Sequence, residues 1–137
     1  MAKNGERGRI MKQNCLIMIS TKVDGKKSEY TVEGEVEILL RSAYLSYCEN
    51  QSVVKVFLCG EKAEINREGD YALSLCLETG KTTQGRIGIA GNSGEISTYT
   101  HKIESRIAEN FIAARFRYDL IIAAEKQEME LNLFVKI

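Results

Sequence analysis

Two charged residues, Glu49 and Arg67, stand at positions that the alternation of the sequence assigns to an apolar face. Arg67 ends the segment KAEINR, in which Ala63 and Ile65 occupy the same alternate positions. Glu49 ends the segment AYLSYCE, in which a leucine and Tyr47 do the same. A charge on a buried face is costly unless it is paired or reaches water. We interpret the two residues as a rim ion pair or as side chains that extend to solvent; the alternative is a ligand contact, with an anionic head group bound by Arg67.

Four tyrosines also occupy the apolar alternation of their segments: Tyr30, Tyr47, Tyr71 and Tyr118. A tyrosine ring packs well in a core, but its buried hydroxyl needs a hydrogen-bond partner. We interpret the four as core residues whose hydroxyls reach the rim, and the alternative is a small cavity lined by tyrosine. Together with Arg67 and Glu49, they are the predicted ligand-binding residues.

His101 is the only histidine of the chain. A lone histidine cannot build a two-histidine metal site, but it can serve as the base for a serine or cysteine nucleophile. That role requires a positioned partner, whereas His101 shares its alternation with Tyr99 and Ile103. We therefore interpret it as a strand residue without a catalytic role. A hydrolase that uses His101 is the least favoured alternative, and we predict that the protein is not an enzyme.

No cofactor motif is complete in this sequence. The four cysteines include no C-x-x-C pair of the kind that zinc sites use, so we predict neither a metal nor a cofactor. We expect buried free thiols in a reducing compartment, the cytoplasm. The GKT at Gly80–Thr82 resembles the end of a phosphate loop, but Leu75 stands where that loop needs glycine, and we predict a hairpin turn.

Length and charge set further bounds on the function. A chain of 137 residues is one domain by the usual expectation. The 19 basic and 19 acidic residues leave no net charge, which argues against a nucleic-acid binder. No segment approaches the roughly 20 apolar residues of a membrane span. We assign residues 1–12, MAKNGERGRIMK, to a disordered basic tail or an alternative-start extension, and residues 13–137 to the domain.

Ten segments show the two-residue period of β-strands and are separated by turn residues. They cover residues 14–23, 28–39, 43–49, 53–59, 62–67, 70–78, 82–90, 95–107, 112–123 and 127–137. The GNSG of residues 91–94 is a strong turn signal. Residues 102–116 also fit helical spacing, but the alternation on both flanks favours two strands and a turn.

Successive short strands predict an all-β fold, a single antiparallel up-and-down β-barrel of about eight to ten strands. Closure of the barrel removes the open edges of the sheet. The third and fifth strands of such a meander run in the same direction, so Glu49 and Arg67 should lie at the same mouth. In SEYTVEGEVEI, Gly34 falls on the inward alternation, which indicates a bend or close packing.

Several stretches spread over nearly the whole chain after Met11 resemble a known family. They are VEGE, YLSYCE, INREG, RYDL and the closing ELNLFVKI. In order and spacing, they are similar to the bacterial DUF1934 family. The resemblance implies a calycin-like (lipocalin-like) β-barrel and carries over no catalytic residues.

We therefore expect a non-enzymatic binding module for a small, partly apolar ligand, by analogy with the fold. The alternative is a protein-interaction or structural barrel whose interior is filled with side chains, which the large inward residues favour. The expected partners are a small apolar or amphipathic ligand and, as an alternative, a second copy of the chain in a homodimer. Nucleic acid and membrane are not expected partners.

Overall fold

Ten strands follow from the alternating apolar residues in the computed structural model, which describes residues 12–137. The predicted N-terminal tail lies outside the described residues, apart from Lys12. The strands are β1 (Gln13–Val23), β2 (Lys26–Ile38), β3 (Ser42–Glu49), β4 (Ser52–Cys59), β5 (Lys62–Glu68), β6 (Ala72–Glu78), β7 (Thr82–Ile89), β8 (Asn92–Ile107), β9 (Phe111–Ile122) and β10 (Glu125–Lys136). Within this part of the chain, no helix is long and apolar enough to cross a membrane.

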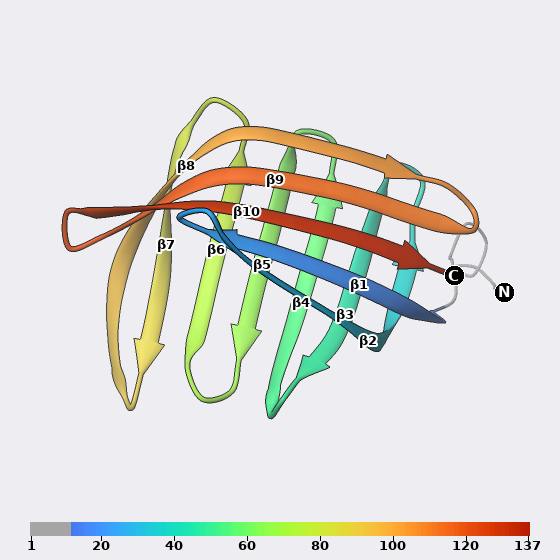
Figure 1. The fold of residues 1–137 in the computed structure, drawn as a ribbon, viewed down its shortest axis with the longest axis horizontal. Helices are drawn as coiled ribbons and strands as arrows, with labels where there is room; N and C mark the ends of the chain where they lie inside the picture. Colours follow the sequence, from blue (N-terminus) through green and yellow to red (C-terminus); the bar gives the residue numbers. More distant parts are fainter. Residues whose placement is uncertain (1–11) are drawn as a thin grey trace, which may run out of the picture.

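The strands close into one antiparallel barrel in which each pairs with its neighbours along the chain and β1 pairs with β10 (Figure 1). The prediction of an all-β antiparallel barrel is confirmed. The two-strand interpretation of residues 102–116 is also confirmed, because β8 and β9 pair across a turn that Ala108 N and Phe111 O close at 2.9 Å. Gly80 and Lys81 of the GKT segment lie in the turn between β6 and β7, as expected, with Gly80 at a φ of 78°, and Thr82 begins β7.

The interior of the barrel is packed with large apolar side chains. Each strand turns alternate residues inward, and burial of one such side chain contributes about 1.5–3 kcal/mol. The largest of those that are less than 2 % exposed are Phe116, Ile17, Leu45, Leu58, Leu75, Leu77, Ile112 and Leu133. The inward side chains therefore meet across the barrel and form a continuous core.

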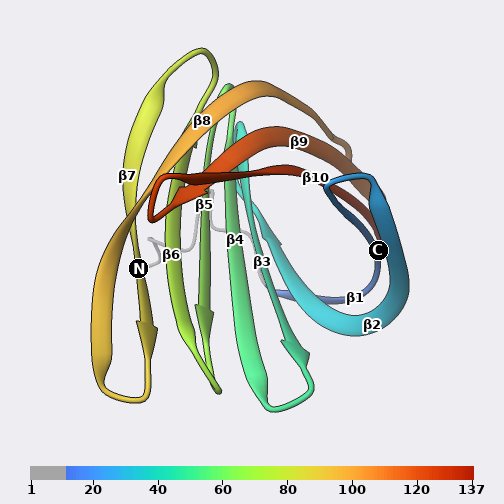
Figure 2. The same ribbon diagram turned by 60° about the vertical axis from the view of Figure 1, so that its left-hand side comes forward.

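Gly34 marks the place where β2 approaches β3 most closely. A Cβ atom there would lie 2.6 Å from the backbone oxygen of Ser46 and 2.8 Å from the Cδ1 atom of Ile17, so only glycine fits. Pairing with β3 begins at Gly34 and continues to Ile38. Residues 26–33 of β2 pair only with β1, and this part of the chain curves strongly (Figure 2). Between residues 26–33 of β2 and the end of β3, only side chains can form the contacts that join the two strands, because the backbones are not paired there.

The turn between β7 and β8 differs from the prediction. The GNSG segment was expected to form it, but Asn92 to Gly94 already belong to β8. The two turn residues are Ala90 and Gly91, with φ angles of 53° and 84°. Two successive positive φ angles are typical of the two-residue hairpin turn that matches the twist of the flanking strands.

The cysteines are free, as expected, but three of the four are not buried. Cys15 is buried, whereas Cys48, Cys59 and Cys76 are exposed. The reason is the two-residue period: Cys48 follows the inward Tyr47, and Cys76 lies between two inward leucines. The expectation of buried thiols was therefore wrong for these three residues.

Candidate functional site at the barrel mouth

Glu49 and Arg67 meet at one mouth of the barrel. Strands β3 and β5 run in the same direction and both end there, as the alternation predicts. Arg67 Nη1 donates a hydrogen bond to Glu49 Oε1, and the side chains of Arg67 and Glu49 are 14 % and 26 % exposed. The expected ion pair at the rim is therefore present. Its low exposure makes it stronger than a surface pair but also costly to desolvate.

Tyr30 completes this pair from the opposite side of the β2–β3 seam. Its hydroxyl donates to Glu49 Oε2, so the two carboxylate oxygens are shared between Tyr30 and Arg67. Burial raises the pKa of Tyr30 above its usual value of 10.0, and the hydrogen bond to Glu49 raises it further. The contact joins β2 to β3 at a level where their backbones are not paired.

Ser52 and Asp70 extend the cluster, and the sequence analysis missed both. Arg67 Nη2 donates to Ser52 Oγ at 3.1 Å, and Ser52 Oγ donates to Asp70 Oδ1 at 2.9 Å. The hydrogen bond from Ser52, and then Tyr71 N–H and Arg67, hold the pKa of Asp70 below its usual range. Gly69 allows this approach, because a Cβ atom there would lie 2.2 Å from Ser52 Oγ. The available signals were a serine at an inward position at the start of β4 and an aspartate next to a glycine.

Of the remaining predicted tyrosines, Tyr71 contacts the guanidinium and the other two lie in the core. Arg67 Cζ lies 4.6 Å from the centre of the Tyr71 ring, an attractive cation–π geometry. Tyr47 and Tyr118 are buried on the inward face. Burial raises the pKa of Tyr47, with a further contribution from the Glu49 charge, and burial raises the pKa of Tyr118 to about 12. The structure thus brings Arg67, Glu49, Tyr30 and Tyr71 into contact, with Tyr47 and Tyr118 in the core nearby.

Three buried polar atoms have no hydrogen-bond partner in the described part of the chain. They are Arg67 Nε and the hydroxyl oxygens of Thr98 and Thr100. Both threonines are fully buried on the inward face of β8, and Thr100 lies opposite Tyr118 in the strand register. A buried polar group without a partner costs about 1–3 kcal/mol, so these three atoms are exceptions in an interior whose other polar groups are paired.

His101 lies on the outer face, at a β-bulge that the sequence analysis did not foresee. The register of β8 against β9 shifts between Thr100 and Lys102, so His101 is an extra residue. His101 and Lys102 both face outward and Ile103 faces inward. The expected alternation of His101 with Ile103 was therefore wrong. Bulges of this kind redirect side chains, and here His101 Nε2 lies 2.9 Å from Asp119 Oδ2.

The histidine–aspartate pair lines a polar depression of about 340 Å³. Its other lining residues include Lys22, Arg117 and Lys126, but neither a serine nor a cysteine. His101 could act as a base and Asp119 could orient it, but no serine or cysteine nucleophile lines this depression beside them. Among residues 12–137, no cluster of three or more His, Cys, Asp or Glu side chains is arranged to hold a metal ion.

Comparison with known proteins supports the fold. The YwiB protein of Bacillus subtilis, a crystal structure, is similar with a TM-score of 0.81 and 16 % sequence identity, and the match covers 98 % of each chain. At that identity, the likeness concerns the fold alone. No curated protein matches the chain. The sequence profile of a family described as "Domain of unknown function (DUF1934)" matches residues 17–133. The chain belongs to the DUF1934 family.

Proposed function

We propose that this protein is a non-enzymatic binding module that holds one small, partly apolar ligand at the barrel mouth, with the anionic group of the ligand on Arg67. The observation that carries the proposal is the set of buried polar atoms without partners. One of them, Arg67 Nε, belongs to the mouth cluster, by which we mean the linked side chains of Tyr30, Glu49, Ser52, Arg67, Asp70 and Tyr71. Binding sites of small ligands combine apolar walls with a few converging polar groups. The mouth offers that combination.

The guanidinium of Arg67 has one edge suited to an anion. Nη1 is occupied by Glu49, and Nη2 contacts Ser52 at 3.1 Å and Asp70 at 3.4 Å. A carboxylate or phosphate binds bidentately to the Nε and Nη2 edge of an arginine. Such an anion would satisfy Nε and replace the long contact with Asp70. The Tyr71 ring and the Glu49 carboxylate already hold the guanidinium in place, which lowers the entropy cost of binding.

The apolar part of the ligand would contact the buried tyrosines. Tyr47 and Tyr118 provide large apolar rings, and their hydroxyls are protonated at neutral pH, as those of ordinary tyrosines are; burial raises their pKa values further. The hydroxyls can therefore donate hydrogen bonds to a ligand. The proposal places this binding in the cytoplasm, where the four unpaired thiols remain reduced.

A second candidate function is a protein-interaction or structural barrel. The packed interior favours it, because large buried side chains, among them Phe116, Ile112 and Leu133, fill the space inside the barrel that a large ligand would need. In that case, the mouth cluster only stabilises the end of the barrel and joins β2 to β3.

Native mass spectrometry of the freshly purified protein, followed by solvent extraction, separates the two functions. The ligand-binding proposal predicts a discrete excess mass that is released on denaturation and is absent from Arg67→Met. The control Arg117→Met changes an arginine on the outer face and should keep the excess mass. A bare mass for the unmodified protein, or an excess mass that survives in Arg67→Met and in Glu49→Gln, would refute binding at the mouth and favour the filled barrel.

A further inference from the structure

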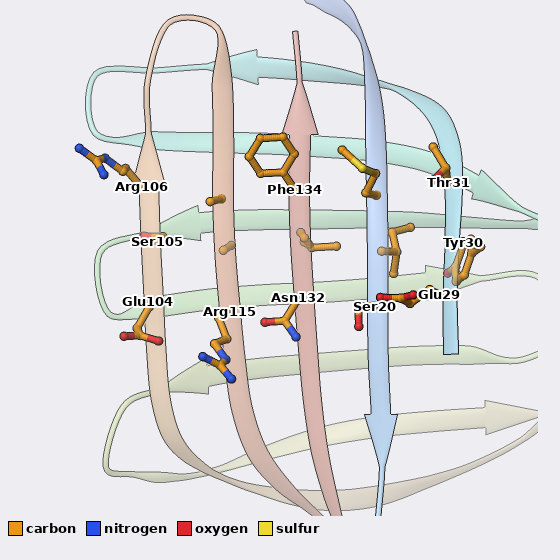
Figure 3. A pocket seen from close by; sticks show the side chains of 15 residues that line it. Ser20, Glu29, Tyr30, Thr31, Glu104, Ser105, Arg106, Arg115, Asn132 and Phe134 are labelled. Carbon is orange, nitrogen blue, oxygen red and sulfur yellow. The ribbon is translucent and has the colours of Figure 1, made fainter. Parts of the chain in front are cut away.

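A groove of about 670 Å³ lies on the outer wall of the barrel, across β2, β1, β10, β9 and β8 (Figure 3). Its volume falls within the roughly 300–1,000 Å³ that is typical of small-molecule sites. Most of the side chains that line the groove face outward. Arg67, Glu49 and Tyr71 are not among the lining residues, and the residue that the groove shares with the mouth is Tyr30, whose hydroxyl donates to Glu49.

Apolar side chains form the floor of the groove. Met18 pairs with Phe134 in the register, and Phe134 pairs with Ala113, so the three form one row across β1, β10 and β9. We call these three residues the apolar row. Met18 and Phe134 are 39 % and 41 % exposed, although the outward face of a barrel strand is usually polar. Ala113 is small and leaves space beside the Phe134 ring. The Phe134 ring stacks on that of Phe111, with 5.8 Å between the ring centroids.

Arg106 ends the apolar row. It pairs with Ala113 in the register and lies at the edge of the groove, as Figure 3 shows, while Thr31 pairs with Met18 at the other end. Within residues 12–137, Arg106 forms no ion pair. An exposed apolar surface that ends at an arginine is complementary to an apolar molecule with a negative head.

The neighbouring charges of the groove are already paired. A second row, two residues along each strand, contains Asn132 and Arg115, and both donate to Glu130, at 3.2 Å and 3.0 Å. Glu104 pairs with Lys102 at 3.4 Å, and Glu29 pairs with Lys27 at 3.1 Å. The two glutamates of the groove are therefore neutralised by lysines outside it, which leaves Arg106 as the charge that determines ligand preference.

We propose that this groove binds a single amphipathic anion, a molecule with an apolar body and a carboxylate or phosphate head, with its body on the apolar row and its head on Arg106. The site goes beyond the function proposed for the mouth and does not depend on it. From Met18 to Arg106, the whole molecule would cross three strand intervals, about 14 Å at the usual spacing of strands, and its body would cross the first two of them. Asn132 and Thr31 supply hydrogen bonds at the sides of the groove.

A second copy of the chain is a poorer occupant of this groove. A stable interface between proteins buries about 800 Å² on each partner and has an apolar centre. The apolar row is bordered on one side by a row that contains Glu29, Arg115 and Glu104. On the other side, Lys136 stands between the exposed Leu16 and Phe111, so the apolar surface grows by only two residues. The narrow, hollow floor suits a small molecule better than a flat protein surface.

Titration of isotope-labelled full-length protein with decanoate, followed by backbone amide NMR, tests the proposal. We expect saturable shifts in β1, β9 and β10 around the apolar row. Arg106→Gln should weaken binding about tenfold, because it removes a charged hydrogen bond, and Phe134→Thr should weaken it by a similar factor through lost apolar contact. Decyltrimethylammonium, which has the same chain and the opposite charge, should bind more weakly than decanoate.

Matched variants decide between this groove and other surfaces. Arg117→Gln, on the outward face of β9, and Tyr44→Thr, an exposed aromatic residue on β3, should bind decanoate as the unmodified protein does. Binding that is lost in Arg67→Met but kept in Arg106→Gln would assign decanoate to the mouth and overturn the proposal. Absence of saturable binding, or a dimer that Phe134→Thr dissociates, would also overturn it, the latter in favour of a second copy.

Discussion

The barrel mouth and the outer groove use the two faces of the same strands in opposite ways. On β2, Tyr30 turns inward to Glu49, while its neighbours Glu29 and Thr31 line the groove. The mouth places charged groups on the face that is otherwise apolar, and the groove places apolar groups on the face that is otherwise polar. Each exception carries an energetic cost, through desolvated charge at the mouth and exposed apolar surface in the groove. Such exceptions are where function, rather than folding, explains the residue types.

The two regions differ in how their exceptional residues are satisfied. At the mouth, Arg67, Glu49 and Tyr30 bond to one another and join strands, so the cluster contributes to the fold as well as to any ligand site. The side chains of the apolar row lie on the outer face of strands that are already held together by backbone pairing and by the inward core. Stability measurements should therefore respond strongly to changes at the mouth and weakly to changes in the groove.

Among changes at the mouth and in the groove, replacement of Arg67 by methionine should give the largest effect. The change leaves the Glu49 carboxylate desolvated with Tyr30 as its hydrogen-bond partner, and we expect the free energy of unfolding to fall by about 3 kcal/mol. Urea titration measures this change. Arg115→Met, which breaks the exposed pair with Glu130 on the outer wall, should cost only about 0.5 kcal/mol. If the double variant Arg67→Met with Glu49→Leu recovers none of the loss, the uncompensated charge is not its cause.

Alkaline pH should destabilise the protein through the buried tyrosines. The pKa of Tyr118 is raised from 10.0 to about 12, so the folded protein retains a proton that the unfolded chain releases between these values. Stability is therefore intact below pH 10 and falls as the pH rises toward 12, by roughly 2–3 kcal/mol for this residue. Urea titrations at about pH 9 and about pH 11.5 measure the loss. Tyr118→Phe should reduce the loss, and an equal loss in that variant would contradict the assignment.

The mouth could be predicted from the sequence because its charges interrupt a regular alternation. Arg67 and Glu49 stand at inward positions of short, clearly alternating strands, and antiparallel order alone brings the two strand ends together. Ser52 and Asp70 were missed because their contact forms only when the turn at Gly69 folds over the start of β4. The alternation of residues along a strand gives no information about the path of such a turn.

The groove was missed because short stretches of β1 and β10 are apolar on both faces. In CLIMI and LFV, outward Met18 and Phe134 stand between inward residues, so a continuous apolar run hides the exposed member. The signal that could have found the groove was this break in alternation on two strands that pair at the closure of the barrel. The bulge at His101 was missed for a related reason, because one extra residue reverses the alternation without any mark in the sequence.

Removal of an unpartnered hydroxyl should stabilise the ligand-free protein. Thr100 Oγ1 is buried without a partner, so Thr100→Val is expected to raise the free energy of unfolding by about 1 kcal/mol. Thr83→Val is the matched control, since Thr83 Oγ1 donates to Cys76 O, and its loss should destabilise by about 1 kcal/mol. Urea titration gives both values. A destabilised Thr100→Val would mean that its hydroxyl already has a partner, such as a bound water or ligand.

Phe134→Thr should have the smallest effect on stability, in contrast to its effect on binding. Phe134 is 41 % exposed on the outer face and threonine retains a strong preference for strands, so we expect the free energy of unfolding to change by less than about 0.5 kcal/mol. The matched inward residue Phe116 is fully buried, and Phe116→Ala should cost about 3–5 kcal/mol. Thermal and urea unfolding of the two variants give the comparison directly. If Phe134→Thr proves as costly as a core substitution, its stacking on Phe111 supports the wall itself, and the exposed ring needs no ligand to explain it.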